Sequence, residues 1–192
     1  MAPGETSQAK TAPQPLYLVQ RFVNTVDLET GDDELSSPEA LRDWFAERGL
    51  MDASAAVSAA DLERAIDVRE GLRAVLLQNN GLPLDQEAVE RLDRAVGRAS
   101  VRVRFAPGRD PELVADCEGV DGALAQLMAI VTAAVEHGRW ERLKACPRAE
   151  CEWAFYDKSK NRSGRWCSMD SCGNIEKAKA FRERHRGHGG QA

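Results

Sequence analysis

Four cysteines near the C-terminus have the spacing of metal ligands. They form two pairs, each with four residues between its members, and fifteen residues separate the pairs: Cys146 and Cys151, then Cys167 and Cys172. Four thiolates fill the tetrahedral shell of Zn²⁺ and leave no position for water, so such a site is structural. Metal binding can contribute ~10–16 kcal/mol of apparent folding free energy to a segment too short for its own core. The spacing therefore predicts one structural zinc ion.

The start of the chain supports reduced cysteines. Residues 1–15 are polar and rich in proline, without the apolar region of a signal peptide, and we expect them to be disordered. No apolar run of ~18 residues predicts a transmembrane helix. Thiols of a cytoplasmic protein stay reduced, which favours metal ligation over disulfides. The sequence thus predicts a cytoplasmic protein with no membrane contact.

The charge is distributed unevenly along the chain. The 192 residues carry a net charge of −5, but residues 1–138 hold 13 Lys and Arg against 24 Asp and Glu, whereas residues 139–192 hold 13 against 7. An acidic body with a basic end is typical of a protein whose end meets a polyanion. The alternative is a solvated charged tail.

The basic residues of the cysteine segment fall into two groups that predict contacts with nucleic acid. One lies between the cysteine pairs and the other follows Cys172: Lys158, Lys160, Arg162 and Arg165, then Lys177, Lys179, Arg182 and Arg186. Each neutralised phosphate releases counterions, and this gives affinity without sequence choice.

The first 140 residues predict a helical body. Apolar residues recur at helical spacing, and capping residues such as Ser37, Ser58 and Asp85 mark helix starts. The expected helices cover residues 16–27, 37–48, 58–80, 85–97 and 122–136. Strict alternation predicts a half-buried strand over 101–105, with a returning strand over 112–116. The expected fold is mainly α, in the α+β class, with one short hairpin in the body.

The cysteine segment predicts a small module of its own. Residues 152–157 suit a strand, 158–164 a basic turn and 165–167 a returning strand, and a helix follows Cys172 to about residue 186. This knuckle, hairpin and helix are close to a treble clef. The expected divisions are a disordered tail over 1–15, a helical domain over 16–140, the zinc module over 141–187 and a disordered end over 188–192.

Several motifs resemble known families. The runs Arg142–Pro147, Phe155–Asn161, Arg165–Met169 and Cys172–Asn174 resemble the CGNR zinc finger, and Phe22–Asp27, Ser37–Leu41 and Val68–Arg73 resemble the ABATE domain, which is ascribed to stress-response regulators. The resemblance implies a bacterial transcription regulator with a helical sensing domain and a DNA-binding finger. One position departs from it: the arginine that ends the CGNR motif is Ile175 here.

Three polar residues interrupt apolar helical patterns in the body: Asn24, Arg69 and Arg73. Polar groups near a helical core need partners. Our hypothesis is that they bind a small anionic ligand, a carboxylate or a phosphate. The alternative is an internal hydrogen-bond network.

Two functional classes remain after these observations. The first is a zinc-dependent DNA-binding transcription regulator with a sensing domain. Such a regulator could act as a homodimer, although no heptad pattern in the sequence indicates one. The second is a zinc-stabilised adaptor that binds protein or RNA. An enzyme is not expected, because four cysteines leave no open zinc position and no catalytic motif occurs elsewhere.

Overall fold

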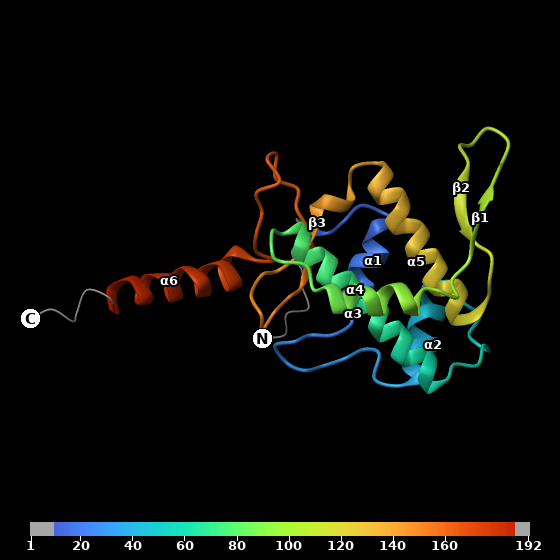
Figure 1. Cartoon of the computed structure of the whole chain (residues 1–192), viewed down its shortest axis with the longest axis horizontal. Coiled ribbons are helices and arrows are strands. Elements are labelled where there is room, and N and C mark those ends of the chain that lie inside the picture. Colours follow the sequence, from blue (N-terminus) through green and yellow to red (C-terminus); the bar gives the residue numbers. More distant parts are fainter. Residues whose placement is uncertain (1–9, 187–192) are drawn as a thin grey trace, which may run out of the picture.

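The computed structural model describes residues 10–186. Six α-helices, two hairpins and short helical turns follow one another (Figure 1): α1 Leu16–Val23, α2 Pro38–Glu47, α3 Ala59–Asn79, α4 Gln86–Ala95, β1 Val101–Arg104, β2 Glu112–Ala115, α5 Gly119–Glu136, η2 Trp140–Arg142, β3 Leu143–Ala145, β4 Ala154–Tyr156, η3 Met169–Gly173 and α6 Asn174–Arg186. The predicted fold class is confirmed: a helical domain precedes a small module that holds the four cysteines.

The core of the body lies among α1, α2, α3 and α5. Phe22 of α1 and the neighbouring Trp44 and Phe45 of α2 form an aromatic cluster, with ring centroids 5.5 to 5.9 Å apart. All three side chains are buried. The same continuous core includes Leu143 of β3 and Ala154 of β4. The cysteine module therefore packs on the helical domain.

The helix starts predicted from Ser37, Ser58 and Asp85 are confirmed, whereas α5 begins at Gly119 rather than at residue 122. Ser37 accepts a hydrogen bond from the Ala40 amide, and Ser58 forms a reciprocal capping box with Asp61. Asp85 caps α4 through the Ala88 amide. These side chains satisfy amides that have no partner within the first helical turn.

Two predictions about the N-terminal segment are corrected. The first helix ends at Val23 rather than near residue 27, and Asn24 follows as its C-terminal cap. Residues 10–15, predicted as part of a disordered tail, are ordered: Ala12 is buried, and its amide donates to Gln20 Oε1 at 2.8 Å. Residues 1–9 and 187–192 lie outside the described part of the chain, and the predictions for them stay untested.

The predicted hairpin of the body forms, but its burial was predicted wrongly. β1 and β2 pair antiparallel, with Val103 opposite Leu113. All four residues of β1 are exposed, and Val103 is 51% exposed. The reason is that the two-stranded ribbon extends beyond the helices (Figure 1). Alternation within a strand thus does not decide whether another element covers its apolar face.

Helix α5 is long and apolar enough to meet the length and composition of a membrane-spanning helix, with a mean hydropathy of 1.3. In the structure it packs against α1 and α3, and Ala123, Leu124 and Leu127 are fully or almost fully buried. Core helices of globular domains commonly have this composition, so the helix is weak evidence for a membrane segment.

In the cysteine module, the strand β4 pairs with a different strand from the one predicted. β4 pairs with β3, with Lys144 opposite Phe155, and residues 165–167 are not a strand. The correct partner precedes the first cysteine, so Cys146 and Cys151 lie in the connection between the two strands. The three-residue β3 was missed because it is too short to show alternation.

Replacing Gly71 tests a close contact between α3 and α4. A Cβ atom at this position of α3 would lie 2.4 Å from Leu92 Cβ and 2.9 Å from the Ala88 carbonyl oxygen on α4. We expect Gly71→Ala to lower the free energy of unfolding by about 1–3 kcal/mol, because the helices must move apart. Urea denaturation measures this change, and Gly97→Ala, at the more open end of α4, is a comparison variant.

Candidate metal centre

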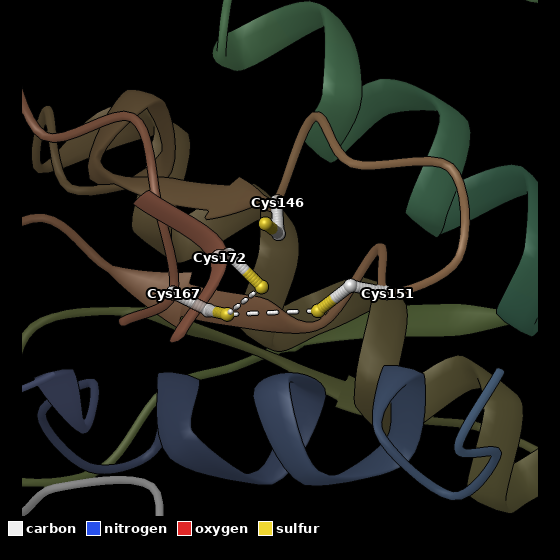
Figure 2. Close-up of side chains that lie close together, drawn as sticks. All are labelled: Cys146, Cys151, Cys167 and Cys172. Carbon is white, nitrogen blue, oxygen red and sulfur yellow. Dashed lines mark hydrogen bonds between the residues drawn. The ribbon is translucent and has the colours of Figure 1, made fainter. Parts of the chain in front are cut away.

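The four predicted cysteines come together in space. Their sulfur atoms all lie within 4.8 Å of one another, and Cys167 Sγ lies 3.6 Å from Cys151 Sγ and 3.6 Å from Cys172 Sγ (Figure 2). Four sulfurs at about 2.3 Å from a zinc ion stand about 3.8 Å apart in a tetrahedron. The donor set and its spacing therefore fit a tetrahedral thiolate site.

Two structural units supply one cysteine pair each. Cys146 directly follows β3, and Cys151 ends the turn that leads toward β4. Cys167 precedes η3, one turn of π-helix, and Cys172 lies within it, just before α6. Gly173 is buried next to Cys172, and a Cβ there would lie 2.8 Å from Met169 Sδ. The absence of a side chain at Gly173 thus lets this turn pack against the side chain of Met169.

The thiols influence one another strongly. Hydrogen bonds from Cys151 and Cys167 lower the pKa of the Cys146 thiol to about 2, whereas their contacts with Cys146 raise the pKa values of Cys151 and Cys167. A bound divalent cation would favour ionisation of all four thiols, because cysteine ligates metals as the thiolate.

Backbone amides and one arginine surround the sulfur atoms. The amides of Arg148 and Cys167 donate to Cys146 Sγ, and the Trp153 amide donates to Cys151. Arg148 Nη1 lies 3.7 Å from Cys172 Sγ, and its Nη2 donates to Glu29 of the body at 3.1 Å. The Cys172 contact raises the pKa of Arg148. These donors offset the negative charge of four thiolates. The sequence analysis missed Arg148; its place two residues after Cys146 was the available signal.

A buried ion pair organises the loop between the cysteine pairs. Lys144 Nζ donates to Asp157 Oδ2 at 2.8 Å and also to the carbonyl oxygens of Arg162 and Gly164. Asp157 accepts from the amides of Ser159 and Gly164. Burial opposes ionisation of Asp157, but these hydrogen bonds outweigh it and lower its pKa to about 2. The sequence analysis did not identify this pair, because its members lie 13 positions apart and no spacing rule joins them.

The predicted nucleic-acid-binding residues occupy two exposed places. Lys158, Lys160, Arg162 and Arg165 lie on the loop that follows β4, which corrects their predicted position on a hairpin tip. Lys177, Lys179 and Arg182 are exposed on α6, which projects from the body (Figure 1). The side chain of Arg186 lies outside the described part of the structure. Arg162 also pairs with Glu141.

The position that departs from the family motif is on the surface. Ile175 lies in the first turn of α6 and is 42% exposed. An arginine here would therefore face solvent or a partner. Its replacement leaves the four cysteines and their surroundings unchanged.

The three residues considered for an anionic ligand have protein partners. Asn24 bonds the backbone of Ala154 through both amide atoms, and Arg73 donates to the carbonyl oxygens of Val23 and Glu152 and to Glu70. Arg69 contacts Asp33, Glu70 and Thr25. These contacts form the internal network that was the alternative, and the anionic ligand stays a prediction without support from them.

Comparisons with known proteins agree with the two parts of the fold. Residues 17–139 match the family model ABATE, described as "Putative stress-induced transcription regulator". Residues 142–185 match the model of the CGNR zinc finger. A search of the curated proteins found no relative that matches the chain.

Proposed function

Because the chain belongs to the ABATE family and carries a CGNR zinc finger, we propose that it is a zinc-dependent transcription regulator that binds DNA. Cys146, Cys151, Cys167 and Cys172 hold one structural zinc ion. Four thiolates complete the coordination shell, so the metal stabilises the fold and activates no water. The protein therefore acts by binding rather than by catalysis.

The observation that carries the proposal is the set of exposed cations on the metal-organised module. The loop from Lys158 to Arg165 is fixed by the Lys144–Asp157 pair, and α6 begins at the turn that holds Cys172. Two basic surfaces, one on this loop and one on α6, thus extend from an otherwise acidic chain. Such surfaces bind phosphates, and the acidic body keeps the rest of the protein away from the polyanion.

We assign residues 16–140 to the sensing domain and residues 141–187 to the finger. The two parts share one core, so a change in the helical domain reaches the finger through direct contacts. A cytoplasmic location, a homodimer and a small anionic effector are further parts of this proposal. Light scattering of the purified protein measures the oligomeric state.

Titration of fluorescent duplex DNA at several salt concentrations tests the function. We expect binding that weakens steeply as salt rises, with a slope set by the number of phosphates contacted. Replacing Lys158, Lys160 and Arg165 together by alanine should lower the slope of log K against log salt by up to about 3, because each cation contacts about one phosphate.

The matched control removes the same charge from the body. Arg102, Arg104 and Arg109 are exposed on the β1–β2 hairpin, and their triple replacement by alanine should leave the slope unchanged. Equal losses for both triple variants, or no duplex binding at low salt, would contradict DNA binding by the finger. Preferential binding of single-stranded RNA or an acidic protein would favour the adaptor instead.

A further inference from the structure

The helical domain binds the backbone of the finger next to a metal ligand. Asn24 Oδ1 accepts from the Ala154 amide at 2.7 Å, and Asn24 Nδ2 donates to the Ala154 carbonyl oxygen at 2.9 Å. Gln20 Nε2 donates to the same oxygen at 3.1 Å. Asn24 and Gln20 are 4% and 2% exposed, so water does not replace these bonds easily.

A second contact holds the residue that directly follows Cys151. Arg73 Nη1 donates to the Glu152 carbonyl oxygen at 3.0 Å, while its Nη2 donates to the Val23 carbonyl oxygen at 2.8 Å. The guanidinium thus joins the end of α1 to the finger. Arg73 is 2% exposed and lies on α3, a long helix of the body.

The segment between these two contacts has an unusual backbone. Glu152 has a φ of 43°, in the left-handed region that a residue with a Cβ rarely adopts. This turn directs the Trp153 amide to Cys151 and the Trp153 carbonyl to the Cys146 amide, at 3.0 Å. Such strain persists where the surroundings fix the conformation on both sides, and Arg73 and Asn24 stand on those two sides.

We propose that Asn24 and Arg73 are positioning residues of the metal site: they hold Glu152–Ala154 in place and so maintain the left-handed turn at Glu152 that presents Cys151 to the metal. The inference rests on the proposed metal site but not on DNA binding. Neither residue touches the metal.

The contacts also make metal binding and the state of the helical domain interdependent. A movement at the end of α1 or at Arg73 on α3 loosens the turn after Cys151, and metal binding in turn tightens these helices. This coupling is reciprocal in free energy. The helical domain therefore influences the finger through its metal ligand, without a flexible linker between them.

Competition between the full-length protein and a chromogenic chelator for Zn²⁺ tests the inference. Outer groups of metal sites typically contribute a factor of about 10–100 to metal affinity, and we expect Asn24→Ala to weaken Zn²⁺ binding by that factor. Glu152→Gly should restore much of the affinity in the Asn24→Ala background, because glycine adopts the left-handed turn without help.

The control is Arg21→Ala, also on α1, whose ion pair with Glu34 lies on the surface. It should leave Zn²⁺ affinity unchanged. If Asn24 only stabilised the core, Asn24→Ala would lower thermal stability equally with and without zinc. Adding Glu152→Gly would then restore no Zn²⁺ affinity. An Asn24→Ala variant that folds and binds Zn²⁺ like wild type, or a loss of affinity that Glu152→Gly does not reduce, overturns the proposal. A wild-type protein that binds no Zn²⁺ refutes the metal site itself.

Discussion

Cys151→Ser is expected to abolish stoichiometric zinc binding and to destabilise the whole protein. Removing one of four thiolates leaves three ligands and lets the knuckle that contains Cys146 and Cys151 open. Structural zinc contributes ~10–16 kcal/mol of apparent folding free energy in small zinc fingers. The variant should therefore lose a large share of the free energy that folds the module. Elemental analysis should give about one zinc per wild-type chain and much less for the variant.

The shared core determines how far the damage extends. Leu143 and Ala154 of the finger pack in the same cluster as Phe22 of α1, so unfolding of the finger exposes apolar surface on the body. We therefore expect a lower melting temperature for the helices as well as a disordered module. Cys117→Ser is the control, because Cys117 lies apart from the cluster and contacts Ser100. Full zinc content in Cys151→Ser would contradict the assignment of the ligands.

Asp157→Asn is expected to produce the second largest effect. The substitution leaves the charge of Lys144 buried with a neutral partner, and removal of one member of a buried pair costs about 3–5 kcal/mol. The loop that carries the basic residues should also lose order, because Asp157 accepts the amides of Ser159 and Gly164. Chemical denaturation measures the loss of stability. The DNA titration measures how far duplex affinity falls when the loop that carries the basic residues loses order.

A control variant and the pH dependence of stability distinguish the buried ion pair from an ordinary surface pair. Glu141→Gln breaks the exposed pair with Arg162 and should cost less than about 1 kcal/mol. The pKa of Asp157 is lowered to about 2 in the folded protein, against about 4 in the unfolded chain. The stability that Asp157 contributes is therefore complete above about pH 4 and disappears as the pH falls toward 2. An advantage of wild type over Asp157→Asn that stays constant below pH 4 would contradict the ion pair.

The features that local chemistry determines could be predicted from the sequence. Ser37, Ser58 and Asp85 mark helix starts because a capping side chain acts on amides two or three residues away. The four cysteines were recognisable because their residue type and paired spacing are typical of metal ligands. Their convergence within 4.8 Å agrees with that interpretation.

The features that depend on long-range contacts could not be predicted. β3 has three residues, and its pairing with β4 spans the first cysteine pair. Asn24 and Arg73 were recognised as polar residues in an apolar pattern, but their partners lie 130 and 79 positions away in the sequence. No spacing rule gives such partners, so the sequence left a ligand site and an internal hydrogen-bond network as alternatives. The exposure of β1 has the same cause, because only the tertiary arrangement decides which face is covered.

Hydrogen exchange of the wild-type protein, with zinc bound and after its removal, tests the central claim most directly. The claim is that one zinc ion holds the finger in place against the helical domain. We predict that zinc removal abolishes the protection of amides in Leu143–Tyr156 and Met169–Gly173 and reduces it at the end of α1, where Asn24 binds the finger. Unchanged protection of these amides in the zinc-free protein would contradict the claim.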